Sequence, residues 1–309
     1  MKCKGRLVKN RASIDIGSNS CILLILDDDK NILYEEARIT ALGKNLDDNK
    51  IFREKSMKDT LEALEAYSDV CKKFNISPNE VVLTATEASR VAKNAIDFYD
   101  EVEKRIGFKV DLISGEQEAY YTALGVSLMS PSNDDEIVIM DIGGASTELV
   151  KVRLNPFAIL ETISTAVGSV RATDWLEHDS FDENIVEATK NLKFENYKNR
   201  PLVCVAGSMT SIAMMLSDKK EFDAGFINSL KTNSEVYIKE TSPLMEQSKE
   251  SLEGRFSFLG KRIHSIVGGI KTSQFFISNL GPSDISFSTY GLRYGTLLSG
   301  DFEKEGVKS

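Results

Sequence analysis

The alternation of hydrophobic and polar residues along the chain predicts short strands and longer amphipathic helices. Met57, Leu61 and Leu64 recur at helical spacing and predict a helix over 54–75. Other helices are expected over 89–107 (ending on Gly107), 115–128, 181–194, 208–216 and, after the glycine pair 268–269, up to 280. Strands are expected at 12–16, 21–26, 32–40, 81–86, 110–114, within 137–165, and at 201–205. A turn-rich segment at 129–136 precedes the second half, and the order is typical of an α/β fold with mixed sheets.

Two of the expected strand pairs are interrupted by similar polar turns. The chain reads ASIDIGSNSCILLIL over 12–26 and IVIMDIGGASTELVKV over 137–152, so DIGSNS and DIGGAS share Asp, Ile, Gly and the last Ser. We interpret this repeat as a sign of two structurally related halves. Each turn would present backbone N–H groups and an Asp carboxylate at one tip, which suits a phosphate and a hydrated Mg²⁺. The alternative is a purely structural turn, in which Gly and Asp only reverse the chain.

Composition and charge narrow the classes of function. The net charge of −9 argues against general nucleic-acid binding, so no nucleic-acid partner is expected. Four scattered cysteines without a CxxC pair and two histidines fit no usual zinc site and are typical of a reduced, cytoplasmic protein. The apolar run at 21–26 is too short to span a bilayer and the N-terminus lacks a secretory signal, so no membrane partner is expected. The absence of GxxxxGK[ST], and of a glycine turn opening directly into a helix, excludes P-loop and Rossmann motifs.

A second group of polar residues lies in ISGEQEAYYTALGV, residues 113–126. Glu118 is near the start of the expected helix and would serve as a general base if it faces the same site as the turns. Acids are also favoured at a helix start for structural reasons, and Ser114 with Gln117 fits a capping box. Arg90 and Arg293 are candidates for neutralising phosphate charge, although a lone Arg is more often a surface or ion-paired residue.

Six motifs in this order resemble the exopolyphosphatase / guanosine pentaphosphate phosphohydrolase (Ppx/GppA) family over nearly the whole chain. They are DIGSNS (15–20), ATEASR (85–90), ISGEQEA (113–119), DIGGASTELV (141–150), VAGSMT (205–210) and GLRYG (291–295). The resemblance implies an α/β fold of two related actin-like (ribonuclease H-like) domains flanking a central cleft, in the short two-domain form. The domains expected are residues 1–124, which the segment 296–309 would complete, and residues 125–295.

The resemblance also implies roles for individual residues. Glu118 corresponds to the general base and Arg90 to a catalytic arginine, while Asp15, Asp141 and Glu148 correspond to acids that hold Mg²⁺ or Mn²⁺. The residues that correspond to phosphate-binding positions in three glycine-containing loops are Gly17, Ser18, Asn19, Ser20, Gly143, Gly144, Ser146, Thr147, Gly207, Ser208 and Thr210.

Four positions depart from the family pattern. Ala145 stands at the third glycine of DIGGGS, and Ala206 replaces the first glycine of a pair in the third loop. Tyr294 replaces the acid of LREG, and Thr289 stands where an Asp is common. We expect an altered fit rather than lost chemistry, because an added methyl makes a left-handed backbone costly while Glu118 remains.

The resemblance implies a hydrolase that releases terminal orthophosphate from a phosphoanhydride chain by attack of water. Inorganic polyphosphate is the first choice of substrate, and guanosine pentaphosphate, with the tetraphosphate as a related ligand, is the second. The alternative is a non-catalytic or weakly active regulatory protein that binds a nucleotide or alarmone, and a kinase of the same superfamily is more remote. The sequence leaves a homodimer open.

Overall fold

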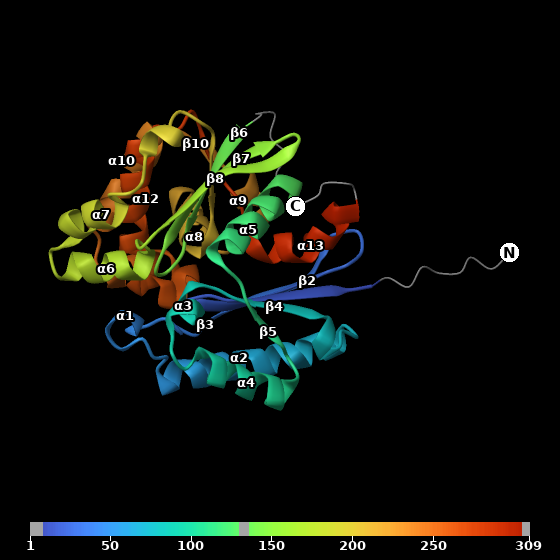
Figure 1. The fold of residues 1–309 in the computed structure, drawn as a ribbon. Coiled ribbons are helices and arrows are strands. Elements are labelled where there is room, and N and C mark those ends of the chain that lie inside the picture. Colours follow the sequence, from blue (N-terminus) through green and yellow to red (C-terminus); the bar gives the residue numbers. More distant parts are fainter. Residues whose placement is uncertain (1–8, 130–135, 305–309) are drawn as a thin grey trace. The chain divides into compact units, whose positions relative to one another are not determined.

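The computed structural model describes residues 9–129 and 136–304, which form two compact units (Figure 1). The first unit holds the residues up to Ser114 together with 296–304, and the second holds Gly115–Gly295. A boundary at residue 124 would divide helix α5 (Gly115–Met129), which lies whole in the second unit. The turn expected at 129–136 falls, at 130–135, outside the described residues. Within the described ranges, no helix is both long and apolar enough to cross a membrane.

The first unit contains a five-stranded sheet in the order β3-β2-β1-β4-β5. Its strands are β1 (Arg11–Ile16), β2 (Ser20–Leu26), β3 (Ile32–Ile39), β4 (Val81–Ala85) and β5 (Val110–Leu112). β2 runs antiparallel to β1 and β3, whereas β4 is parallel to both β1 and β5. Ala12, Ile14 and Ile16 of β1 are buried, as expected for the apolar run of a central strand.

Helices α1 (Leu46–Asn49), α2 (Glu54–Lys73), α3 (Glu87–Val91) and α4 (Ala95–Ile106) belong to this unit. The amphipathic helix predicted from residue 54 is confirmed as α2, which buries Leu61 and Leu64. The single helix predicted over 89–107 is wrong, because the chain is extended at Ala92 between α3 and α4. Asn94 explains the break: its side chain exchanges two hydrogen bonds, of 2.8 and 3.1 Å, with the backbone of Phe52. The end at Gly107 is confirmed, with φ of 76°.

The second unit contains a six-stranded sheet in the order β10-β11-β9-β6-β7-β8. Its strands are β6 (Glu136–Ile142), β7 (Thr147–Leu154), β8 (Phe157–Thr165), β9 (Leu202–Val205), β10 (Lys231–Thr232) and β11 (Ile285–Phe287). β7 is antiparallel to β6 and β8, while β9 is parallel to β6 and β11. The run β8-β7-β6-β9-β11 therefore repeats the order and directions of β3-β2-β1-β4-β5, which confirms two related halves.

The helices of the second unit are α5 to α12, and α13 (Leu292–Lys304) continues from it into the first unit. Those not yet given are α6 (Ser169–Glu177), α7 (Phe181–Thr189), α8 (Ala206–Leu216), α9 (Ala224–Ser229), α10 (Ser234–Met245), α11 (Lys249–Arg255) and α12 (Ile266–Leu280). The glycine pair expected before the last apolar helix lies inside α12, so that expectation is corrected. A Cβ on Gly268 would lie 2.3 Å from the carbonyl oxygen of Ser169, so the pair lets α12 pack closely against α6.

Candidate functional site

The two repeated turns join corresponding strands in the two sheets. The first loop (residues 17–20) connects β1 to β2, and the second loop (residues 143–146) connects β6 to β7. In the first, the N–H of Gly17 donates to the carbonyl of Ser20 at 2.9 Å; in the second, the N–H of Gly143 donates to Ser146 at 3.0 Å. The sequence repeat therefore has the same hydrogen-bonded geometry in both units.

The carbonyl groups of both loops are held by the segment that follows the third strand of each sheet. In the second unit, the carbonyls of Gly143 and Gly144 accept from the first N–H groups of α6, each at 2.9 Å. In the first unit, the carbonyl of Ser18 accepts at 2.8 Å from Gly43, and that of Asn19 accepts from Thr40 and Ala41. The first N–H groups of α6 have no partner inside the helix, so the loop carbonyls satisfy them.

The N–H groups of the loops point away from these supports. A trans peptide group directs its C=O and the next N–H in opposite directions, so fixing the carbonyls of Gly143 and Gly144 also orients the N–H groups of Gly144 and Ala145. Among the described residues, these two N–H groups and those of Ser18 and Asn19 donate to no backbone carbonyl. Consecutive N–H groups held in this way are suited to bind an anion such as a phosphate oxygen.

The acids assigned to a metal lie next to these loops. Asp15 and Asp141 are half-buried near the ends of β1 and β6, in their respective units. Glu148 is directly opposite Asp141 across the hairpin and is only 6% exposed, and its Oε1 accepts from the hydroxyl of Ser164 at 2.6 Å. Opposed residues in a hairpin share a face, so the Asp141 and Glu148 side chains leave the sheet on the same side.

The protein supplies no complete metal cage in the described residues, where no group of three or more His, Cys, Asp or Glu side chains comes together. Mg²⁺ usually keeps several waters and uses only one or two carboxylates with substrate phosphates. The Asp141 and Glu148 pair beside a loop of N–H groups therefore fits Mg²⁺ better than it fits a cation that needs an all-protein site.

Two hydroxyls predicted to bind phosphate donate hydrogen bonds within the protein. Thr147 is fully buried, and its hydroxyl donates to the carbonyl of Val167. Thr210 is 7% exposed, and its hydroxyl donates to the carbonyl of Ala206 at 3.1 Å. A hydroxyl has a single proton, so neither side chain can also donate to a phosphate in this conformation.

The third predicted loop lies at the start of α8 and carries one of the departures. Ala206 has φ of 70°, a left-handed conformation that an alanine adopts only at a cost, as anticipated from the sequence. Ala145 is not among the residues with positive φ, so the expected strain does not arise in the second loop.

Arg262 lies beside the third predicted loop, a contact that the motifs did not indicate. A Cβ on Gly207 would lie 2.8 Å from Nη2 of Arg262, so its guanidinium group packs directly against the start of α8. Burial, and then the positive charge of Arg293, lowers the pKa of Arg262. Two cations therefore lie in the same region of the second unit, and nothing in KRIH (261–264) could have indicated a contact with a glycine 55 positions away.

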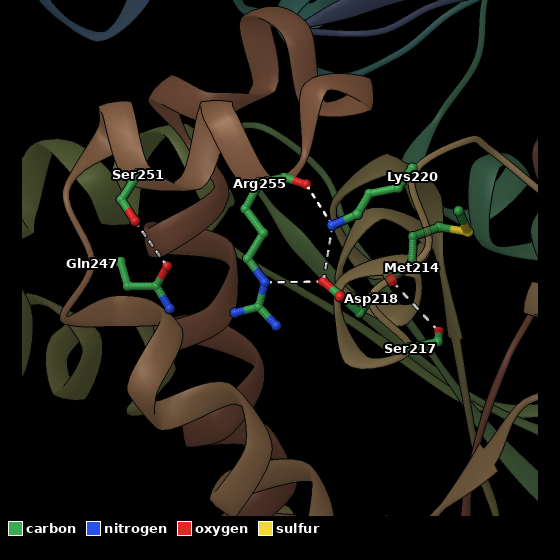
Figure 2. Close-up of polar contacts among 7 residues, drawn as sticks. All are labelled: Met214, Ser217, Asp218, Lys220, Gln247, Ser251 and Arg255. Carbon is green, nitrogen blue, oxygen red and sulfur yellow. Dashed lines mark hydrogen bonds and ion pairs between the residues drawn. The ribbon is translucent and has the colours of Figure 1, made fainter.

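Helix α11, which precedes Arg262, is hydrogen-bonded to the residues that follow the C-terminal end of α8 (Figure 2). Oδ1 of Asp218 accepts from Nε of Arg255 at 3.0 Å and from Nζ of Lys220 at 3.2 Å. These bonds, that of Arg255 first, lower the pKa of the Asp218 carboxyl. The three side chains are exposed, so they orient α11 while adding little stability.

Glu118 and Arg90 lie in different units. Glu118 is half-buried in the first turn of α5, and Glu116 in the same turn is exposed. Arg90 is exposed at the end of α3, and its Nη1 donates to the carbonyl of Ile113 at 2.8 Å. Arg90 thus supports the chain just before α5, in addition to any contact with substrate.

Tyr294 and Thr289, the two residues near the C-terminus that differ from the family pattern, both make contacts within the second unit. Tyr294 is fully buried and packs edge-on against Tyr290, with ring centroids 4.9 Å apart. The N–H of Thr289 donates to Asn228 at 2.8 Å, and the Asn228 amide returns a bond to the Thr289 hydroxyl. A Cβ on Gly295 would lie 1.8 Å from the carbonyl of Tyr121, so only glycine lets α13 approach α5 here.

A mixed α/β sheet that occurs twice, with a glycine turn at the same place in each copy, defines the structural class of this chain. The chain belongs to the Ppx/GppA phosphatase family, whose sequence profile matches residues 25–301. Both the family and an α/β fold with two related halves, as expected from the motifs, are thereby confirmed.

Individual relatives agree with this assignment. The chain is 31% identical over 312 residues to a bifunctional 3-dehydroquinate synthase/phosphatase of Fusobacterium nucleatum, covering 94% of this chain and 46% of that protein. The chain thus spans about half the length of this curated relative. The crystal structure of the Ppx/GppA family member of Aquifex aeolicus is 27% identical and covers 97% of this chain and all of that one, with a TM-score of 0.77. An exopolyphosphatase structure from Cytophaga hutchinsonii, at 23% identity, covers 97% of this chain and 99% of that one with a TM-score of 0.83, and it shows the shared fold.

Proposed function

We propose that this protein releases terminal orthophosphate from a phosphoanhydride chain, with inorganic polyphosphate as the first substrate and guanosine pentaphosphate as the second. The observation that carries the proposal is the pair of loops whose carbonyls are bound to the fold and whose N–H groups face the other way. Such N–H groups stabilise the charge on phosphate oxygens without reorganising during the reaction.

In the proposed reaction, each loop binds phosphate oxygens through its N–H groups, and Arg262 and Arg293 offset part of the phosphate charge. Asp141 and Glu148 would hold Mg²⁺, or Mn²⁺, which supplies charge neutralisation at the phosphate oxygens. Glu118 would accept a proton from the attacking water, whose oxygen bonds to the terminal phosphorus. The bond from that phosphorus to the bridging oxygen breaks, so the shortened chain leaves with the bridging oxygen and the terminal phosphate is released as orthophosphate. Membership of a phosphatase family supports this reaction class.

The test is orthophosphate release by purified protein with Mg²⁺ from either substrate. Glu118→Gln should lose about two orders of magnitude in rate, the usual size of a general-base effect. Glu116→Gln is the matched control, because Glu116 is an exposed acid in the same helical turn and should keep its rate. An unchanged rate in Glu118→Gln would rule out this base.

The strained Ala206 is the observation that favours the second candidate, a regulatory protein that binds a nucleotide without turning it over. Wild-type protein that binds guanosine pentaphosphate but releases no orthophosphate from either substrate would establish this alternative and contradict the hydrolase.

A further inference from the structure

The backbone at the start of α6 is hydrogen-bonded to the first two residues of the second loop, Gly143 and Gly144. Ser169 donates its N–H to Gly143 at 2.9 Å, Val170 donates to Gly144 at 2.9 Å, and the N–H of Arg171 reaches Gly144 at 3.3 Å. A Cβ on Gly168, which precedes the helix, would lie 2.4 Å from the oxygen of Gly144. The helix therefore touches the loop backbone directly.

The side chain of Arg171 extends this contact to the next carbonyl of the loop, that of Ala145. Its Nη1 donates to the carbonyl of Ala145 at 2.7 Å and to that of Ala166 at 2.8 Å. Ala166 lies in the connection between β8 and α6. One guanidinium group thus bridges the loop and the segment that supports it. A guanidinium group suits this role better than a lysine ammonium group, because it is planar, always charged and carries several N–H donors in fixed directions.

We infer that Arg171 is a positioning residue for the second loop. By fixing the carbonyl of Ala145, it orients the next N–H, that of Ser146, because the trans peptide group is planar. The helix orients two loop N–H groups and Arg171 orients the third. The inference rests on the proposed function, since the oriented N–H groups matter only if the loop binds phosphate.

The corresponding support in the first unit uses backbone donors. Thr40, Ala41 and Gly43 supply N–H groups to the first loop from the segment after β3. The second loop receives equivalent backbone bonds from α6 and also a bond from the side chain of Arg171 to the carbonyl of Ala145. A change at Arg171 should therefore affect the second loop and leave the first unchanged.

The test compares Arg171→Ala with Arg200→Ala. Arg200 is also half-buried in the second unit and also donates to a carbonyl, that of Lys198 at 3.1 Å, but it pairs with Glu136 at the opposite end of β6 from Asp141. Arg171→Ala should lower kcat for orthophosphate release about tenfold or more, toward the loss seen when an oxyanion donor is removed. Arg171→Lys should recover part of that loss, and Arg200→Ala should keep the wild-type kcat at a similar Tm.

Hydrogen exchange supplies a readout that needs no catalysis. Arg171→Ala should speed the exchange of amides in a peptide covering 143–147 and leave a peptide covering 15–20 unchanged. Equal kcat losses in Arg171→Ala and Arg200→Ala, or unaltered exchange at 143–147, would overturn the positioning role. If the wild-type protein releases no orthophosphate, the proposed function fails, whereas the exchange result still decides whether Arg171 holds the loop.

Discussion

The two glycine loops share a sheet position and an internal hydrogen bond, yet they are supported differently. The second loop lies against the start of a nine-residue helix, with Gly168 in backbone contact and Arg171 bridging two carbonyls. The first loop lies against an irregular segment, where a Cβ on Gly43 would be 3.0 Å from the Cβ of Ser18. The comparison teaches that a repeated motif fixes the turn itself, while the neighbouring segment determines how rigidly its N–H groups are held.

The largest expected effect comes from adding a methyl at the supporting glycine. Gly168→Ala places Cβ 2.4 Å from loop backbone atoms that cannot rotate away, and should lower the free energy of unfolding by about 3 kcal/mol. Gly43→Ala places Cβ 3.0 Å from Cβ and 3.3 Å from Cα of Ser18, a smaller overlap than at Gly168, and should cost about 1 kcal/mol. Urea unfolding measures both, and Gly254→Ala is the control because nothing lies within 4 Å of its Cβ position. Equal losses of unfolding free energy in Gly168→Ala and Gly43→Ala would contradict the proposal that the second loop is packed more tightly than the first.

A smaller effect is expected from the acids beside the loops. Asp141 has Glu148 opposite it, whereas Asp15 has Ile22 at the equivalent place. Asp141→Asn should therefore raise the Mg²⁺ concentration for half-maximal orthophosphate release about tenfold, the scale found for groups that support a metal site. Asp15→Asn should raise it less. A larger shift for Asp15→Asn would contradict the assignment of the metal to Asp141 and Glu148.

The smallest effect concerns the two alanines that replace glycines. Ala206→Gly should raise the free energy of unfolding by about 0.5–1 kcal/mol, because relief of the left-handed alanine exceeds the entropy cost of glycine. Ala145→Gly should be neutral or slightly destabilising and should keep or improve turnover, because Ala145 has no positive φ. If Ala145→Gly stabilised the protein and Ala206→Gly did not, the backbone strain would lie at Ala145 and not at Ala206.

Local patterns in the sequence predicted much of the fold. DIGSNS and DIGGAS predicted related halves because each motif sets a turn through neighbouring residues, and the apolar runs predicted the central strands. The break at Ala92 was missed because it depends on Asn94 bonding to Phe52, 42 positions away. The glycine pair in α12 was misread because its close packing on α6 is a tertiary contact.

The candidate site was predicted only in part, because local motifs can be read from the sequence whereas tertiary contacts cannot. The loops and their acids follow from contiguous motifs, but Arg171 and Arg262 contact those loops across long stretches of chain and belong to no glycine motif. Conversely, the sequence could not show that the hydroxyls of Thr147 and Thr210 donate to nearby carbonyls. Side-chain roles that depend on orientation require the folded backbone.

The central claim is that both loops bind phosphate through their backbone N–H groups. The most direct measurement is hydrogen exchange of the wild-type protein with Mg²⁺, with and without a non-hydrolysable imidodiphosphate analogue of a short polyphosphate. The account predicts slower exchange in peptides covering 15–20 and 141–147 when the analogue is bound. Binding of the analogue with no protection in either peptide would contradict it.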